Sequence, residues 1–102
     1  MVIEKELDSR ISYSNIPDLD EVDMPLFVRT LNSLAEKRMA ENSRLSIHCK
    51  THKDKNALRK KHSVHLKLTG HGNIISAEAS GWSFLSVLQS AIKKLSRQAK
   101  RK

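Results

Sequence analysis

The sequence predicts an α+β domain built as a single β-α-β-β-β-α sandwich, with a four-stranded sheet and two helices on one of its faces. Some segments alternate apolar and polar residues, as strands do when one face is buried. Others repeat apolar residues at helical spacing. The chain has 102 residues, which suits one compact domain with a modest core. With both helices on one side, the other face of the sheet is expected to be open.

The first strand is predicted within residues 3–13, where one parity is apolar and the other charged. Its apolar positions are Ile3, Leu7, Ile11 and Tyr13. An acidic loop, residues 16–23, leads into a helix. Asp23 is placed to cap this helix, and Pro25 in the first turn loses nothing by lacking an N–H group. Helical spacing continues to about residue 41 through Phe27, Val28, Leu31, Leu34, Ala35 and Met39.

Two alternating strands are predicted next, at residues 45–53 and 62–69, joined by the charged connection 54–61. Their inward positions are Leu45, Ile47, Cys49, Val64, Leu66 and Leu68, and the outward positions carry histidine, lysine and serine. We expect a hairpin in which Lys50 lies opposite His65. His48 then lies opposite Lys67, and His52 opposite Ser63.

The sequence GHGN at 70–73 predicts a turn into a third strand at about 73–79. Ser83 then caps a last helix. The apolar stripe of this helix consists of Phe84, Leu88, Ala91, Ile92, Leu95 and Ala99. Lysine and arginine crowd its C-terminal half, where cations also suit the helix dipole.

Charge is distributed unevenly along the chain. Residues 1–42 hold nine Asp/Glu and five Lys/Arg, whereas residues 43–102 hold two Asp/Glu and fourteen Lys/Arg. All five histidines also lie in the second part. A one-sided positive field of this kind favours a polyanion as the partner, over a basic surface that is merely well solvated.

Cys49 and His52, followed by His62 and His65, imitate the ligand spacing of a zinc site. Strand geometry argues against it, because Cys49 and His52 would point to opposite faces. Lysines beside the remaining histidines would repel a dication. We therefore expect no metal, and Cys49 is interpreted as a small buried hydrophobe.

An enzyme is not indicated either, and we expect no cofactor and no small-molecule substrate. A buried Cys49 would not serve as a nucleophile. Asp54 and Glu78 are the only acids after residue 42, so no paired carboxylates stand out there. The sequence Gly-His-Gly at 70–72 is not followed by the Gly-Lys-Ser/Thr of a phosphate loop.

The outward histidines and lysines of the predicted hairpin would repel one another across the strands. A phosphate backbone laid along that face would relieve the repulsion and accept their hydrogen bonds. No aromatic residue lies in the basic strands, so a base-stacking platform is not supported. We therefore expect the face to recognise structured RNA through its phosphates and its shape.

The second half of the chain resembles the ribosome hibernation promoting factor family, also called ribosome-associated inhibitor A or sigma-factor modulation proteins. The likeness covers about residues 24–102 and is clearest in ISAEASGWSFLSVLQSAIKKLSRQAKRK. A family turn of alanine, acid, alanine and glycine is matched by Ala77, Glu78, Ala79 and Gly81. A family helix ending is matched by Lys94, Leu95, Arg97, Gln98 and Arg101. The element order is also similar to that of the family, and to a double-stranded-RNA-binding domain with an added first strand.

This resemblance implies a ribosome-associated translation inhibitor, a hibernation factor that binds small-subunit ribosomal RNA. It would occlude the channel for transfer and messenger RNA without covalent chemistry. The implied partners are the small ribosomal subunit and its RNA, with a role in the stress response. The expected RNA contacts are Lys50, Lys53, Lys55, Arg59, Lys60, Lys61, His65, Lys67, Lys93, Lys94, Arg97 and Arg101.

Two other functions stay open at this point. One is a general structured-RNA-binding module or regulator that is not dedicated to the ribosome. The other is a protein-interaction module that uses the acidic loop 18–23. In each case residues 1–102 are expected to form a single domain, with 1–22 a divergent acidic segment that includes the first strand. The absence of an apolar leader or membrane run and the single cysteine favour a cytoplasmic protein.

Overall fold

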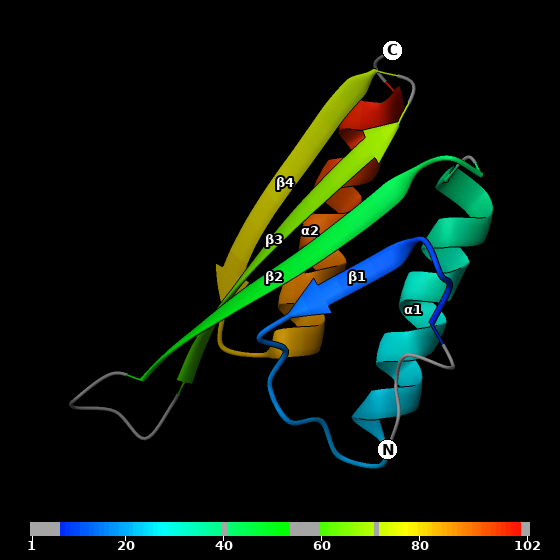
Figure 1. Ribbon diagram of the computed structural model, residues 1–102. Coiled ribbons are helices and arrows are strands. Elements are labelled where there is room, and N and C mark those ends of the chain that lie inside the picture. The colour runs from blue at the N-terminus through cyan, green and yellow to red at the C-terminus, as the bar shows by residue number, and fades with distance from the viewer. Residues whose placement is uncertain (1–6, 40, 54–59, 71, 101–102) are drawn as a thin grey trace.

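The computed structural model describes residues 7–39, 41–53, 60–70 and 72–100, which form the predicted order of elements (Figure 1). The strands are β1 (Ile11–Ser14), β2 (Arg44–Lys53), β3 (Lys60–Gly70) and β4 (Asn73–Gly81), and the helices are α1 (Asp23–Arg38) and α2 (Phe84–Lys100). The sheet has the order β1-β2-β3-β4; β1 runs parallel to β2, and the other neighbours are antiparallel. The predicted fold class and element order are confirmed.

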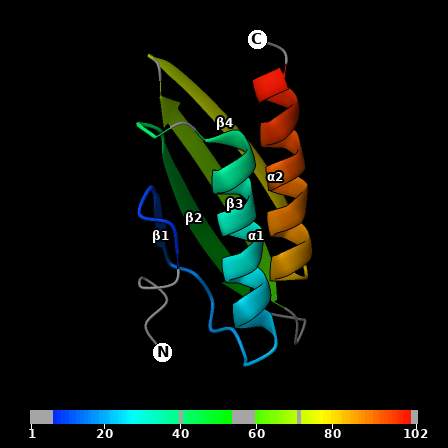
Figure 2. The ribbon, with the colours of Figure 1, turned by 90° about the vertical axis from the view of Figure 1, so that its right-hand side faces the viewer.

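Both helices lie on one face of the sheet, as the turned view shows (Figure 2). The core lies between the two layers, because alternate strand residues and one stripe of each helix meet there. Its largest fully buried side chains are Phe27, Leu31, Leu45, Ile47, Leu66, Leu88, Leu95, Val64 and Cys49. The prediction that Cys49 belongs to the core is therefore confirmed. The opposite face of the sheet carries no helix.

The N-terminus of α1 is capped by Asp20, so the prediction that Asp23 caps it is wrong. The Oδ1 atom of Asp20 accepts hydrogen bonds from the backbone N–H groups of Val22, at 2.9 Å, and of Asp23, at 2.7 Å. Its carbonyl accepts the N–H of Met24 at 3.0 Å, the first bond of helical spacing. Asp20 thus satisfies donors that a helix start leaves unpaired. The helix also ends three residues earlier than expected, at Arg38.

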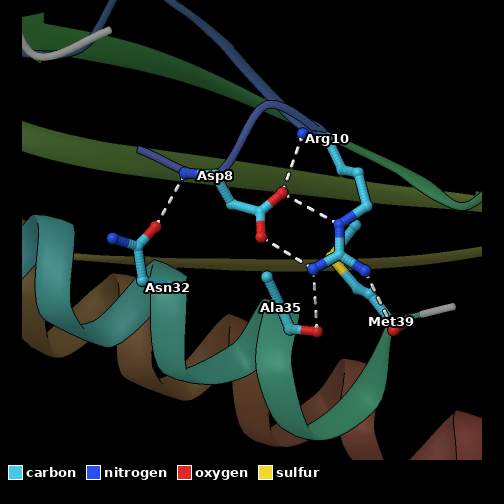
Figure 3. A network of polar contacts seen from close by, with 5 residues as sticks. All are labelled: Asp8, Arg10, Asn32, Ala35 and Met39. Atoms are coloured by element: carbon cyan, nitrogen blue, oxygen red, sulfur yellow. Dashed lines mark hydrogen bonds and ion pairs between the residues drawn. The ribbon is translucent and has the colours of Figure 1, made fainter. Parts of the chain in front are cut away.

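The segment before β1 is held to α1 by a polar network (Figure 3). The Arg10 guanidinium contacts both carboxylate oxygens of Asp8, at 2.8 and 2.7 Å, and donates to the carbonyls of Met39, at 3.1 Å, and Ala35, at 3.5 Å. The Asp8 N–H donates to Asn32 Oδ1 at 2.8 Å. Among the described residues of the expected first strand, the strand itself begins at Ile11. Leu7 is buried outside it, and Ile3 lies outside the described residues.

The network places a cation at the C-terminal end of α1, where the helix dipole favours positive charge. It also sets the pKa of Asp8, which the Arg10 guanidinium lowers to about 2 through hydrogen bonding. The Arg10 carbonyl in turn accepts the N–H of Leu45 at 2.9 Å. The same residue therefore fixes the end of α1 and the start of the pairing between β1 and β2.

The turn between β3 and β4 requires glycine at two positions. Gly72 has φ +77°, the left-handed region that favours glycine. A Cβ on Gly70 would stand 2.6 Å from the Ser43 hydroxyl oxygen. The turn predicted at 70–73 is confirmed, with His71 outside the described residues. After β4, α2 begins directly behind Ser83, the predicted capping position.

Candidate nucleic-acid interface

The side of the sheet that carries no helix is called the open face here. It is formed by the strand residues whose parity is opposite to that of the core. These residues are Ser12, Ser14, Arg44, Ser46, His48, Lys50, His52, Lys61, Ser63, His65, Lys67, Thr69, Ile74, Ser76, Glu78 and Ser80. Their outward direction was predicted correctly for β2 and β3.

The register between β2 and β3 differs from the prediction by two residues. Lys50 lies opposite Ser63 rather than His65, and His48 lies opposite His65 rather than Lys67. His52, expected opposite Ser63, lies opposite Lys61. A shift of two residues keeps every side chain on its face, because strand side chains repeat every second residue. The composition of the open face is therefore as predicted, and its cross-strand neighbours are not.

One row of polar residues crosses all four strands of the open face. It runs Ser14, His48, His65, Glu78. The Ser14 hydroxyl and His48 Nδ1 are 2.8 Å apart, within hydrogen-bonding distance. The two histidines are neighbours across β2 and β3, and Glu78 is the one carboxylate in the row. Imidazoles, hydroxyl and carboxylate here share one flat surface that is accessible to a large ligand.

Serine is frequent on the open face, and the sequence reasoning did not count it among the expected RNA contacts. The open face carries Ser12, Ser14, Ser46, Ser63, Ser76 and Ser80. A hydroxyl donates one hydrogen bond and accepts others, so it can pair with phosphate oxygens or with a ribose hydroxyl. For Ser46 and Ser63 the signal was present in the sequence, because they share the parity of Lys50 and Lys67 in their strands. Small residues between the cations also keep the surface flat.

The end of the β2–β3 hairpin concentrates cations, and it protrudes beyond the other strands (Figure 1). Lys53 lies opposite Lys60, and His52 opposite Lys61. Lys53 and Lys60 have the parity of the core but are exposed, because the hairpin extends past the helices at this end. Lys55 and Arg59, both expected RNA contacts, lie outside the described residues.

His62 lies at the margin of the core, not on the open face. Its Nδ1 atom is 3.2 Å from the Thr51 hydroxyl, and its ring meets Phe84 edge-on with centroids 6.0 Å apart. Burial, with a contribution from Lys60, lowers the pKa of His62 below its usual value. A pocket of about 590 Å³ between His62, Lys60 and the acidic loop adjoins it. The acids of that loop, Asp18 and Asp23, face basic residues of the hairpin there.

The cations of α2 lie on a different side of the molecule from the open face. Lys93 and Arg97 are exposed and stand about half a helical turn from the buried Ala91 and Leu95. Lys94 reaches the rim of the sheet, where its Nζ atom donates to the Glu78 carbonyl at 3.0 Å. Lys93 and Arg97 therefore do not join the strand cations in one surface, whereas Lys94 lies at the edge of the sheet. Arg101 lies outside the described residues.

The cations of the open face make no ion pair with any residue that the structure describes. Within that part of the chain, the ion pair found joins Arg10 and Asp8, on the opposite edge of the fold. Lys50, Lys61 and Lys67 are exposed, and their cross-strand neighbours are serine or histidine. Within the described residues their charge thus has no carboxylate counter-ion, and it is available to an anionic partner.

Cys49 has the environment of a structural cysteine. It is 0% exposed, and burial raises the pKa of its thiol above the usual value. A buried thiol of raised pKa is a poor nucleophile and a poor metal ligand. Among the described residues, no three His, Cys, Asp or Glu side chains are grouped so that they could hold a metal ion.

The fold and the open face together define a class: a two-layer α+β domain that presents one basic, hydroxyl-rich sheet face. A solved structure with a similar fold is the crystal structure of the Thermus thermophilus Protein Y N-terminal domain. The two chains superpose with a TM-score of 0.55 at 15% identity, over 89% of this chain and 92% of that one. At this identity the likeness establishes the fold. No family model and no curated protein matches the sequence.

Over the residues that the structure describes, neither helix has the length and apolar composition needed to span a bilayer.

Proposed function

We propose that this chain is a ribosome-associated translation inhibitor of the hibernation type. It binds RNA of the small ribosomal subunit through the open face and the β2–β3 hairpin. The folded body then occupies the channel that transfer and messenger RNA would use. In this proposal residues 1–102 act in the cytoplasm as one domain, without a cofactor and without covalent chemistry.

The observation that carries the proposal is the unpaired positive charge of the open face. Among the described residues, Lys50, Lys61 and Lys67 make no ion pair. At the hairpin end Lys53 lies opposite Lys60, and a like-charged pair across a sheet costs stability. Phosphates along the face would supply the missing counter-charge, and the six serines would add hydrogen bonds. Two observations direct this to the ribosome: the sequence resemblance described above, and a fold shared with a Protein Y domain of the hibernation-factor type.

Sedimentation tests the proposal. Extract containing the tagged chain is run through a sucrose gradient at low and high salt. We expect the chain to travel with small subunits at low salt and to inhibit translation in vitro. A Lys50→Glu/Lys67→Glu variant should lose both properties while keeping its fold. Migration of the unaltered chain only at the top of the gradient, with normal translation, would overturn the proposal.

A general structured-RNA-binding module is the second candidate. One observation favours this candidate: the described residues of the open face include no phenylalanine, tyrosine or tryptophan side chain for base stacking. Such a face would recognise the phosphate backbone and the shape of an RNA rather than its base sequence. A competition experiment distinguishes the two candidate functions. If free duplex RNA displaces the chain from small subunits at equal mass concentration, binding is general. If a large excess is needed, the ribosome is the preferred target.

A further inference from the structure

The helix layer lies on the side of the molecule opposite to the open face (Figure 2). Its exposed residues form a second basic surface. Arg29 and Lys37 of α1 and Lys93 and Arg97 of α2 are exposed. Arg29 lies two residues from the buried Phe27 and Leu31, and Lys93 two residues from Ala91 and Leu95. That spacing is about half a helical turn. These side chains therefore point away from the sheet.

The two helices enclose a groove within this surface. Its volume is about 400 Å³. Leu34 and Ile92 form its apolar floor, and its walls are hydroxyls and cations: Arg29, Thr30, Ser33, Lys37 and Ser96. This combination of hydroxyls beside cations repeats that of the open face. Both provide donors for phosphate oxygens and for ribose hydroxyls.

The fold does not require the four cations. None of them takes part in an ion pair or side-chain hydrogen bond found within the described residues. The helix dipole favours Lys37 and Arg97, which lie near helix ends. The dipole does not explain why Arg29 and Lys93 are cations. Glu36 is the one exposed carboxylate of α1 beside them.

The surface is also unlike a protein-binding patch. Protein interfaces centre on exposed aromatic or large aliphatic side chains. The exposed large hydrophobic residues of the described chain are Val22, Leu26, Ile74 and Trp82, and none of them lines the groove. Charge complementarity therefore points to a polyanion of repeating phosphates.

We propose that the helix layer is a second RNA-binding surface, so that one molecule bridges two RNA segments on its opposite sides. The inference rests on the proposed RNA binding of the open face and extends it to a second segment. The groove holds the backbone of one RNA segment, with Arg29 and Lys37 on one wall and the α2 cations beside the other. The open face holds the other segment.

Two short RNA duplexes, one with a donor dye and one with an acceptor dye, test the proposal. Each is too short to reach both surfaces. We expect energy transfer to rise as protein is added, to peak near one protein per two duplexes, and to fall in excess protein. Analytical ultracentrifugation should then give the mass of one protein with two duplexes. A complex of two proteins with two duplexes, or of one with one only, overturns the bridging.

Variants show which surface is responsible for each binding step. Arg29→Glu/Lys93→Glu/Arg97→Glu should abolish energy transfer and weaken the second binding step at least tenfold, while the first step keeps its affinity. The charge-preserving variant Arg29→Lys/Arg97→Lys should retain both steps. Each lost phosphate contact should lower the salt slope of the second step by about 0.9. Circular dichroism checks that all variants remain folded.

The outcomes distinguish the inference from the function beneath it. If the unaltered chain binds no RNA at all, the proposed function fails. If it binds one duplex tightly and never a second, the proposed function stands and the bridging fails. If the helix layer captures polyglutamate but no second duplex, the surface belongs to an acidic protein, and the inference is overturned.

Discussion

The acid-rich N-terminal region, residues 7–39, and the basic region, residues 43–98, use charge in opposite ways. In the first, Asp8, Arg10 and Asp20 all make hydrogen bonds that hold an element in place. In the second, Lys50, Lys61 and Lys67 make no ion pair within the described residues, and Lys53 lies opposite the like-charged Lys60. One set of charges builds the fold, and the other is left for a partner.

The difference shows which charged residues are explained by stability and which indicate a binding partner. A charge that satisfies a helix end or closes a network is explained by stability, whether or not the protein binds anything. A charge kept opposite another of its own sign lowers stability. Lys53 opposite Lys60 is the clearest instance. The following predictions test this contrast on one scale, the stability of the folded chain.

The largest expected effect is the loss of Arg10. Arg10→Met removes four hydrogen bonds to Asp8, Met39 and Ala35, and leaves Asp8 without its counter-charge. We expect the melting temperature to fall by about 4–8 °C, the usual effect of losing a partly buried charged network in a domain of this size.

Arg29→Met is the matched control, because Arg29 is an exposed arginine of α1 without such a network. It should change the melting temperature by less than about 2 °C. Equal losses for the two variants, measured by thermal circular dichroism, would remove the contrast between fold-building and available charge.

The second effect is a dependence of the free energy of unfolding on pH, which arises from Asp8. Its pKa is lowered to about 2 in the folded chain from 3.8. The folded state therefore favours the ionised form, and this stabilisation is present above about pH 4. It is lost as the pH falls through 2, because the unfolded chain binds the proton first.

Urea midpoints between pH 2 and pH 6 measure this dependence. Asp8→Asn should be less stable than the unaltered chain at pH 6, and the difference should shrink toward pH 2. A difference that stays constant over that range would mean that Asp8 acts by shape and not by charge.

A smaller effect is expected at the start of α1. Asp20→Ala removes the acceptor for the N–H groups of Val22 and Asp23, and should cost about 1 kcal/mol in the free energy of unfolding. Asp18→Ala, in the same acidic loop, should cost less than about 0.5 kcal/mol, as exposed substitutions usually do. Urea denaturation of the pair decides the matter. An equal cost for both would indicate that the loop stabilises the chain through its net charge.

The smallest effect is expected in the basic region. Lys53→Thr relieves repulsion with Lys60 and places a good strand former in β2. The free energy of unfolding should rise by up to about 0.5 kcal/mol or stay unchanged, while affinity for RNA falls. A clear loss of stability would show that the cations of the hairpin also build the fold.

Much of the fold could be predicted, because local patterns determined it. Alternation placed Cys49 in the core and His48 and His65 on the open face, and apolar spacing identified both helices. The register of the hairpin could not be predicted. Shifts of two residues preserve the side-chain faces, and the charged connection 54–61 offers no turn signal to choose between them.

The candidate site was predicted in part for similar reasons. The strand cations were found because parity defines a face. The α2 cations were grouped with them by charge and by the family resemblance, although helical geometry places Lys93 and Arg97 away from the sheet. Three acids close to the helix start competed as its cap, and only the three-dimensional path of the loop selects Asp20. Which of the expected residues contact RNA stays a prediction.

The rim of the sheet at β4 has a consequence for the behaviour of the chain at high concentration. Lys94 Nζ donates a hydrogen bond to the carbonyl of Glu78, and Gln98 Nε2 donates one to that of Ser76 at 2.7 Å. An uncovered edge strand is a template on which another copy can add its own strand and begin an aggregate. Here two acceptors that an incoming strand would need are already taken by α2. The helix thereby guards this edge against self-assembly and keeps the chain available to other partners.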